Sequence, residues 1–153
     1  MAEARGAITL PMLALTGLLG LALGIGGYTF LYAQGGSYVT DDPAACANCH
    51  VMQAQFDGWR RGPHHHVAVC NDCHVPSGVV ARYAVKALNG WHHSSAFTTG
   101  NYPDVIRIRE SSREIVEGQC RTCHADLVAA MEGGARGDTV SCIRCHDSVG
   151  HLR

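Results

Sequence analysis

Charged and aromatic side chains are scarce in this sequence of 153 residues. Asp, Glu, Lys and Arg make up 16% of it, and Phe, Trp and Tyr make up 7%, whereas about 25% charged residues is usual for a soluble domain. The net charge is -1, which gives no indication of a nucleic-acid partner. Glycine is frequent, with 18 residues. The length fits one domain, and we expect that domain to have only a small core of packed side chains.

Lysine is almost absent. Eleven of the twelve basic residues are arginine, and Lys86 is the only lysine. A codon bias toward GC explains such a ratio, and arginine also suits carboxylate partners, because its planar group forms two parallel hydrogen bonds with them. A lysine that is removed from water loses its proton more readily than an arginine does. Lys86 is therefore a candidate for a role in proton chemistry.

No cysteine lies outside four copies of one pattern, Cys-x-x-Cys-His. The copies begin at residues 46, 70, 120 and 142 and use all eight cysteines, so none remains for a separate disulfide or a free thiol. The pattern attaches c-type haem: the two thiols bond to the porphyrin, and the next histidine is held under the iron. The sequence therefore predicts four covalently bound haem c groups, attached through Cys46 and Cys49, Cys70 and Cys73, Cys120 and Cys123, and Cys142 and Cys145.

Paired cysteines have two other common uses, zinc binding and disulfide frameworks. Two zinc sites with four thiolates each would use all eight cysteines, and so would four disulfides outside the cytosol. Neither use explains why a histidine directly follows the second cysteine in every copy. Four porphyrins would also supply the apolar surface that the side chains do not provide.

Histidines are the expected iron ligands. The motif residues His50, His74, His124 and His146 are the candidates for proximal ligands. Six further histidines, at 64, 65, 66, 92, 93 and 151, are available for the distal positions. We expect the triplet at 64–66 to supply one distal ligand, with His65 as the best candidate, although the sequence does not decide among the three.

A run without charge lies near the N-terminus. Residues 7–33 contain no charged side chain, and a helix of that length reaches about 40 Å, more than the ~30 Å hydrocarbon core of a bilayer. A buried core helix would be unusual at this length in so small a chain. A cleaved signal peptide has a shorter apolar region, and residues 31–33 form a poor cleavage site. We expect residues 1–33 to form an uncleaved transmembrane signal anchor.

Haem attachment predicts the orientation of this anchor. Haem is joined to Cys-x-x-Cys-His outside the bacterial cytoplasm, so the residues that follow the anchor must be exported. The N-terminus then stays inside, and Arg5 agrees weakly with the positive-inside rule. We expect a single-pass protein of the bacterial inner membrane, with its haem domain on the periplasmic side.

The predicted fold class is mainly α: one N-terminal transmembrane helix and a small multihaem c-type cytochrome domain with little regular structure beyond short helices. A linker over 34–40 precedes the tetrahaem domain at 41–153. The first two motifs begin 24 residues apart and the last two 22 apart, with 50 between the pairs. This spacing indicates two di-haem units, at about 41–93 and 112–153.

Local signals predict where the helices of this domain begin and end. An Asp-Asp-Pro run at 41–43 predicts a helix start, and Gly62-Pro63 predicts the end of a short helix over 53–61. A helix is predicted over 77–93, then a loop over 94–103 and an extended segment over 105–109. Ser111 or Ser112 is expected to cap a helix that continues through the third motif to residue 132 and ends at Gly133-Gly134.

Nearly the full chain resembles the membrane-anchored tetrahaem quinol dehydrogenases, and most of all the small subunit of cytochrome c nitrite reductase. The resemblance rests on the anchor, the four motifs, Met52 two residues after His50, Pro76 two residues after His74, Lys86 on the following helix, and His151 shortly after His146. The Cys-x-x-Cys-His-x-Met form and the final histidine favour the nitrite-reductase branch over the nitrate-reductase branch.

The resemblance implies a set of iron ligands. Menaquinol would be oxidised at haem 1, next to the membrane, and Met52 would ligate that haem in place of His50. The spacing alone favours His50. The proximal ligands of haems 2 to 4 would be the other motif histidines, and His65 and His151 would be distal ligands of haems that belong to other motifs. A partner subunit is a source for a further ligand.

The resemblance also implies a quinol site. Lys86 matches a family lysine there, and quinol oxidation needs a nearby proton donor or acceptor. The family has an acidic residue about two turns after this lysine, but this sequence has Asn89, His92 and His93 in that region and no acid. His93 is our candidate for the proton acceptor, or for a group that approaches the iron of haem 1.

Together these features predict a quinol dehydrogenase subunit that passes electrons from menaquinol through four haems to a periplasmic multihaem reductase. The preferred partner is the ammonia-forming cytochrome c nitrite reductase. The chain would not reduce nitrite itself, because the catalytic haem for that reaction, in the large subunit, typically uses a Cys-x-x-Cys-Lys motif, which this sequence lacks. A homo-oligomer within a larger complex is compatible with this function. The alternatives are a general quinol dehydrogenase for other reductases and a membrane-anchored electron-transfer protein without a quinol site.

Overall fold

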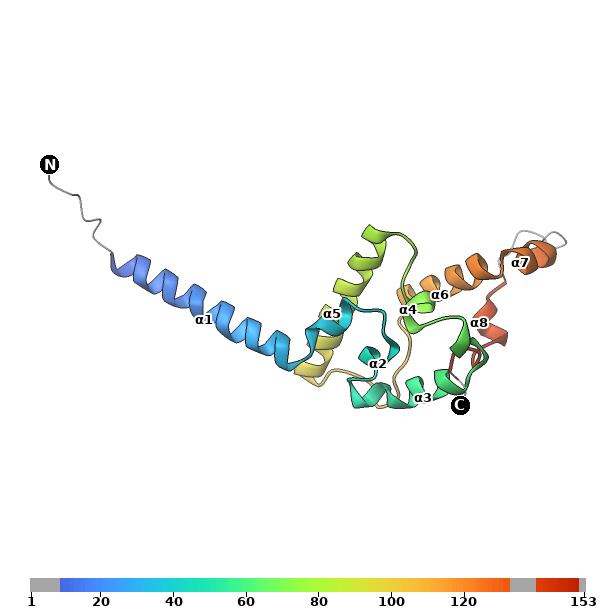
Figure 1. The fold of residues 1–153 in the computed structure, drawn as a ribbon, viewed down its shortest axis with the longest axis horizontal. Helices are drawn as coiled ribbons and strands as arrows, with labels where there is room; N and C mark the ends of the chain where they lie inside the picture. The colour runs from blue at the N-terminus through green and yellow to red at the C-terminus, as the bar shows by residue number, and fades with distance from the viewer. Residues whose placement is uncertain (1–8, 133–139, 152–153) are drawn as a thin grey trace. The chain divides into compact units, whose positions relative to one another are not determined.

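The computed structural model describes residues 9–132 and 140–151, and every regular element in these ranges is helical (Figure 1). The predicted mainly α fold class is confirmed. The chain divides after Gly36 into two compact units. The α-helices are α1 (Leu10–Tyr32), α2 (Pro43–Cys46), α3 (Gln53–Arg61), α4 (Cys70–His74), α5 (Val79–Thr99), α6 (Glu110–Cys123), α7 (Ala125–Glu132) and α8 (Cys142–Cys145); the 3-10 turns are Gly35–Tyr38, His50–Met52 and Pro63–His66.

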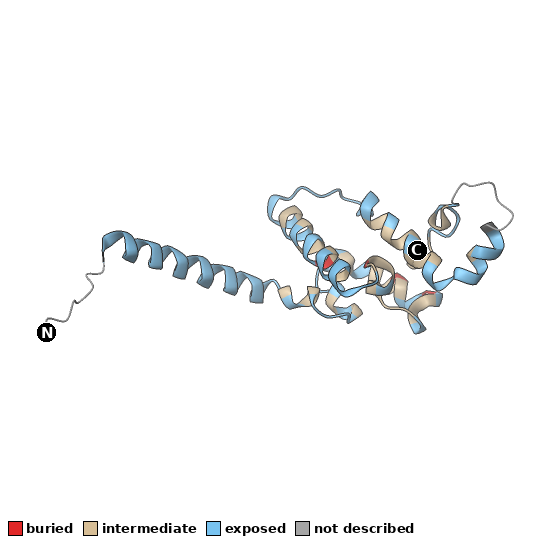
Figure 2. Ribbon diagram, turned by 90° about the horizontal axis from the view of Figure 1, so that it is seen from above, coloured by how far each residue is buried: buried red, intermediate tan, exposed pale blue. Residues whose placement is uncertain are grey.

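Helix α1 is a candidate membrane span by its length and composition. Its 23 residues include Pro11 in the first turn, where a missing N–H costs nothing, and reach about 35 Å. None of its residues is buried within the protein, and Figure 2 shows it exposed throughout. Thr16 satisfies its hydroxyl inside the helix by donating to the Met12 carbonyl at 2.9 Å. The uncharged run therefore forms the long apolar helix that the sequence predicts.

The unit that follows has almost no side-chain core. Among the described residues, Val75 is the one buried apolar side chain, with 3% of its surface exposed, and no large side chain is completely buried. Figure 2 shows buried residues only as small isolated areas. A domain with so little buried apolar surface cannot offset the conformational entropy of folding by packing alone. This agrees with the expectation that cofactors supply most of the core.

Two helix boundaries differ from the sequence predictions. Helix α5 continues to Thr99, so the predicted loop over 94–103 is wrong for residues 94–99. Gly100 ends the helix in the left-handed conformation (φ 66°), where its N–H bonds to the last turn. Helix α6 begins at Glu110 after Arg109, so neither Ser111 nor Ser112 is its cap. An acidic side chain in the first turn suits the positive end of the helix dipole.

Other local predictions are confirmed, with one exception. Asp42 caps α2 by accepting a hydrogen bond from the Ala44 N–H at 2.9 Å, with Pro43 in the first turn. Helix α3 ends at Gly62 as predicted. Residues 125–132 are helical, but they form a separate helix, α7, after α6 ends at Cys123 with His124 as its cap, so the predicted single helix through the third motif to residue 132 is wrong at that point. The predicted stop at Gly133-Gly134 lies outside the described residues.

Candidate functional site

The four motifs lie at the ends of short helical turns. Helices α4 and α8 consist almost entirely of the second and fourth motifs, α6 ends on the third, and α2 ends on the first cysteine of the first motif. In a helix, residues three apart lie on one face, so both thiols of the second, third and fourth motifs, in α4, α6 and α8, point to the same side. The eight cysteines are free in the structure, without disulfides. Each pair is thus available to bond to one flat group.

The order of the motifs in space follows their order in the chain. Cys46 of the first motif lies close enough to Cys70 of the second motif for the two thiols to interact, and this interaction lowers the pKa of Cys46. Burial raises the pKa of Cys73, and Asp72 and then Cys123 of the third motif raise it further. Burial raises the pKa of Cys120 as well, and the nearby Cys142 of the fourth motif raises it further. Groups attached in sequence order would therefore be neighbours.

Direct contacts keep the second, third and fourth motifs together. Helix α4 packs against α6, and Gln119 donates a hydrogen bond to the Val75 carbonyl at 2.6 Å. Glu117, also on α6, binds the start of α8. Its carboxylate accepts hydrogen bonds from the Ser141 hydroxyl and from the N–H groups of Cys142 (2.9 Å) and Ile143 (3.1 Å). No local signal predicted this role of Glu117, because its partners lie 24 to 26 residues away.

Two pairs of histidine rings have the separation expected for two axial ligands of one iron. The centroids of His74 and His151 are 6.0 Å apart, and those of His64 and His124 are 6.2 Å apart. A metal–imidazole bond is about 2 Å long and the ligating nitrogen lies about 1 Å from the ring centroid, so two axial imidazoles place their centroids about 6 Å apart. In each pair, one histidine belongs to a Cys-x-x-Cys-His motif and the other does not.

Contacts of Nδ1 in the two histidines outside the motifs, His151 and His64, support the same interpretation. His151 Nδ1 lies 2.8 Å from the Gln55 carbonyl, and His64 Nδ1 lies 3.4 Å from the Val149 carbonyl. A carbonyl partner holds the proton on Nδ1 and leaves Nε2 free to bind a metal. Burial, followed by the nearby His151, lowers the pKa of His74 to about 4. That keeps its imidazole neutral, as a ligand must be. The residues present therefore fit haem c.

The remaining predicted ligands have other surroundings. His65 packs on Trp59 and His66, with ring centroids 4.7 and 4.6 Å apart, so the structure favours His64 as the member of the triplet that faces a motif histidine. His50 and His146 are exposed, and Met52 is half-buried in the turn after Cys49. The assignments of Met52, His50, His65 and His146 stay predictions.

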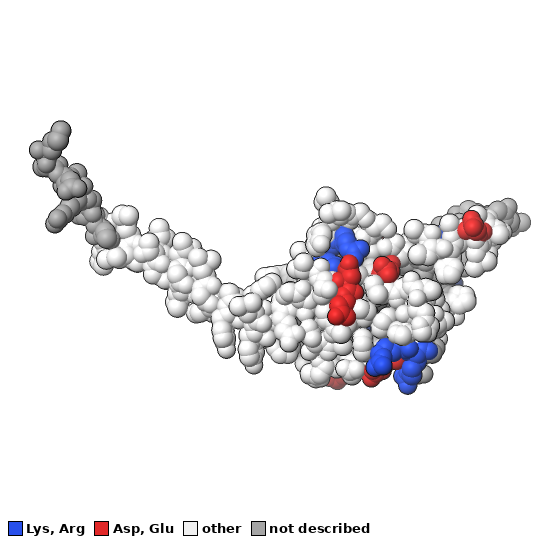
Figure 3. Space-filling model, in the orientation of Figure 1, with Lys and Arg blue, Asp and Glu red and all other residues white. Residues whose placement is uncertain are grey.

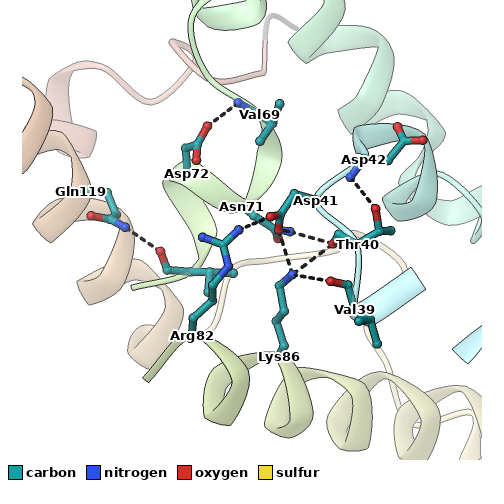
Figure 4. A network of polar contacts seen from close by, with 11 residues as sticks. Val39, Thr40, Asp41, Asp42, Val69, Asn71, Asp72, Arg82, Lys86 and Gln119 are labelled. Carbon is teal, nitrogen blue, oxygen red and sulfur yellow. Dashed lines mark hydrogen bonds and ion pairs between the residues drawn. The ribbon is translucent and has the colours of Figure 1, made fainter. Parts of the chain in front are cut away.

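Lys86 is buried, with 5% of its surface exposed, and its ammonium is surrounded by oxygen atoms. Nζ lies 2.8 Å from Asp41 Oδ1, 3.0 Å from the Thr40 carbonyl and 3.5 Å from the Val39 carbonyl (Figure 4). Figure 4 shows the side chain rising from α5 toward the segment that precedes the first motif. Four residues separate Asp41 from Cys46, so this cluster lies close to the first motif along the chain.

Asp41 is the centre of that cluster. Its other oxygen pairs with Arg82, and Asn71 Nδ2, inside the second motif, donates to Oδ1 at 2.6 Å. The Arg82 contact, then Lys86 and then Asn71, hold the pKa of Asp41 well below its usual range. On the face drawn in Figure 3, basic side chains lie directly beside acidic ones, in keeping with these ion pairs.

His93 lies on α5 two turns after Lys86 and contacts the same segment. Its Nδ1 is 2.9 Å from the Tyr38 hydroxyl, whose ring also lies close to Gly90. Burial lowers the pKa of His93, and His92 and Arg109 lower it further. Burial raises the pKa of Tyr38, and Cys49 and Cys46 of the first motif add to this. Tyr38 therefore contacts His93 and lies near the cysteines of the first motif.

Residues 38–41 thus extend along one face of α5. Tyr38 meets His93 and Asp41 meets Lys86, and three extended residues span about 10 Å, the same rise as two helical turns. The sequence had indicated only a linker ending at residue 40 and a helix start at 41–43. Tyr38 and Asp41 were not identified as site residues, because their partners lie 55 and 45 residues away.

Comparisons with known proteins identify the family of this chain. Residues 9–153 match the family described as NapC/NirT cytochrome c family, N-terminal region. The cytochrome c-type protein NrfH of Wolinella succinogenes is 37% identical over 142 residues, which cover 86% of this chain and 80% of that protein. The cytochrome c nitrite reductase subunit NrfH of Nitratidesulfovibrio vulgaris is 31% identical over 121 residues, which cover 77% of this chain and 72% of that protein.

A solved structure is similar as well. It is the crystal structure of a cytochrome c nitrite reductase NrfHA complex bound to the HQNO inhibitor, and the match has a TM-score of 0.64 with 27% identity, covering 90% of this chain and 91% of that one. The resemblance inferred from the motifs is therefore confirmed at the level of family. With nearly its whole length matched, this chain belongs to the NapC/NirT cytochrome c family.

Proposed function

We propose that this protein is the membrane-anchored, quinol-oxidising subunit of a cytochrome c nitrite reductase, and that it passes electrons from menaquinol to the ammonia-forming catalytic subunit in the periplasm. The family and the two NrfH relatives support this proposal. The observation that carries the quinol site is the position of Lys86: the only lysine of the chain is buried against the segment that leads into the first motif.

We propose one haem c on each of the four motifs. His74 and His151 would both bind the iron of haem 2, and His124 and His64 would bind that of haem 3, in view of the ring separations. His64 then takes the place that the sequence analysis gave to His65. His146 would be one ligand of haem 4, and the partner subunit would supply the other. Met52 would ligate haem 1, with His50 as the alternative.

Oxidation of menaquinol releases two electrons and two protons, and the bound haems supply one-electron carriers for the electrons. Lys86 would hold the quinol by donating a hydrogen bond to one of its oxygens. His93 would take up a proton at Nε2 while the proton on Nδ1 is shared with Tyr38. The pKa of His93 is lowered by the protein atoms around part of the ring, which favours a neutral ring that can accept a proton, and the part of the residue that stays exposed lets it release each proton to water in turn.

We further propose that α1 anchors the protein in the bacterial inner membrane as a single span, with the N-terminus inside and residues 41–153 on the periplasmic side. The first motif begins 14 residues after Tyr32, the last residue of α1. A haem attached there lies within a short length of chain from the bilayer, where menaquinol is dissolved. This nearness agrees with electron entry at haem 1.

The test is the rate of haem reduction by a menaquinol analogue, reduced dimethylnaphthoquinone, in the purified haem-loaded protein. We expect Lys86→Met to slow this reduction by about 100-fold, in the range of a lost acid–base or orienting group, while dithionite still reduces all haems. Equal rates for the variant and the unaltered protein would refute the quinol site. Addition of the nitrite reductase catalytic subunit and nitrite should then reoxidise the haems, and failure to do so would refute the proposed partner.

A further inference from the structure

The part of α5 that follows Lys86 carries no carboxylate, yet the Asp41 carboxylate, which precedes Lys86 in the chain, contacts its ammonium. We propose that Asp41 is a positioning residue of the quinol site, which holds the Lys86 ammonium in place but does not take up the protons of the quinol. This inference rests on the proposed quinol site. It adds a residue and a division of roles between Asp41 and His93.

The contacts of Nζ show how Asp41 would act. A lysine ammonium has three hydrogens, and here they face one carboxylate oxygen and two backbone carbonyls, at 2.8, 3.0 and 3.5 Å. The contact with Val39 is the longest and weakest. A quinol oxygen can replace that contact while Asp41 and Thr40 still hold the ammonium. Among the residues that the structure describes, Asp41 is the charged group in contact with Nζ and thus the one that fixes the direction of the Lys86 side chain.

The charges around Asp41 exclude it as a proton acceptor. Two cations, Arg82 and Lys86, contact its two oxygens, and Asn71 donates a third interaction from α4. These contacts hold the pKa of Asp41 well below its usual range, with Arg82 as the largest cause. A carboxylate stabilised in this way remains ionised at every pH at which the protein would work.

Other charged or titratable groups also face the cluster. Asp72 of α4 helps to raise the pKa of Arg82, the ring of Tyr83 on α5 is centred 5.7 Å from Nζ, and Asp42 is the next residue in the chain. Lys86 lowers the pKa of Cys46 in the first motif, and Asp42 raises it. Among these groups, Asp41 is the carboxylate that touches Lys86 directly. Its removal would leave a buried ammonium without a counter-charge in contact, an arrangement that proteins rarely tolerate.

The experiment compares Asp41→Asn with Asp42→Asn in the full haem-loaded protein. Both variants lose one negative charge at adjacent positions, but Asp42 caps α2, and asparagine caps helices as well as aspartate does. The first measurement is the affinity for HQNO, determined by fluorescence titration. We expect Asp41→Asn to weaken binding by about tenfold, the typical loss for a hydrogen bond to a charged group, and Asp42→Asn to leave it unchanged.

The second measurement is the steady-state kinetics of quinol-analogue oxidation. If Asp41 positions Lys86 for binding, Asp41→Asn should raise the KM for the analogue by about tenfold, in line with the loss of a hydrogen bond to a charged group, and should change kcat less. Asp41→Glu keeps the charge and should restore the KM. If Asp41→Asn fails to take up haem, Asp41→Glu still decides: a KM like that of the unaltered protein supports the proposal, and a raised KM refutes it.

A double-mutant cycle separates positioning from a structural role. If Asp41 acts through Lys86, Asp41→Asn should not weaken HQNO binding further in a Lys86→Met background. An equal loss in both backgrounds would overturn the proposal, as would Asp41→Asn binding HQNO like Asp42→Asn. An unaltered protein that neither binds HQNO nor oxidises the analogue would instead overturn the proposed quinol site, so the two failures are distinct.

Discussion

Glu117 is predicted to hold the fourth motif in place. Its carboxylate accepts the Ser141 hydroxyl and the N–H groups of Cys142 and Ile143, and so caps α8 from a different helix. A hydrogen bond to a charged group contributes about 1.5–3 kcal/mol and a helix cap about 0.5–2 kcal/mol. Since Glu117 is partly exposed, we expect Glu117→Ala to destabilise this contact by about 2 kcal/mol.

Native-state hydrogen exchange measures this contact directly. A loss of about 2 kcal/mol corresponds to exchange about 30-fold faster at the amides of Cys142 and Ile143. Glu114→Gln is the matched control, because Glu114 lies one turn earlier on α6 and is exposed. It should leave both amides unchanged. Equal exchange in Glu117→Ala and the control would refute the cap.

The same contact predicts a pH dependence with a definite sign. Burial raises the pKa of Glu117, but the hydrogen bonds from Ser141, Cys142 and Ile143 outweigh it, so the pKa lies below the usual 4.5. A carboxylate with a lowered pKa in the folded state stabilises the fold above its unfolded pKa, and this contribution is lost as the pH falls through the folded pKa. Protection of the two amides should therefore weaken below pH 4.5, and protection that persists there would contradict the ionised cap.

Three further predictions concern the histidines. His151→Ala should remove one ligand of haem 2 and convert one low-spin haem to high-spin in the EPR spectrum, while His92→Ala should not; unchanged low-spin signals would contradict the His74–His151 pair. His64→Ala should have the same effect on haem 3, whereas His65→Ala should leave the spectrum intact, and the reverse result would restore His65 as the ligand. Quinol-analogue oxidation should decline as the pH falls through the lowered pKa of His93, below 6.5, and this decline should be absent in His93→Gln; an identical acid limb in both would exclude His93 as the acceptor.

The motifs and several helices could be predicted because their signals are contiguous. Cys-x-x-Cys-His contains both thiols and a ligand within five residues. The start of α2 is likewise indicated by two adjacent residues, Asp42 and Pro43. The end of α5 was missed, because the Gly100 signal lies beyond residues whose composition is typical of a loop. A glycine that adopts a positive φ decided the boundary, and its conformation is not visible in the sequence.

The pairing of residues across the chain could not be predicted in the same way. His74 meets His151, Lys86 meets Asp41, and Glu117 meets Ser141 over separations of 24 to 77 residues. Such contacts depend on how the helices are arranged, and in this domain ordinary hydrophobic periodicity gives little information, because few side chains are buried. Lys86 was recognised as the single lysine and through the family resemblance, whereas Asp41 had only the signature of a helix start.

Low-temperature EPR of the oxidised, haem-loaded protein, recorded with and without HQNO, tests most directly whether a quinol binds beside the first motif. The proposed function predicts a high-spin signal from haem 1 that shifts when HQNO is added, and no such shift in Lys86→Met. Four low-spin haems that do not respond to HQNO would contradict it and would leave a membrane-anchored electron-transfer protein without a quinol site.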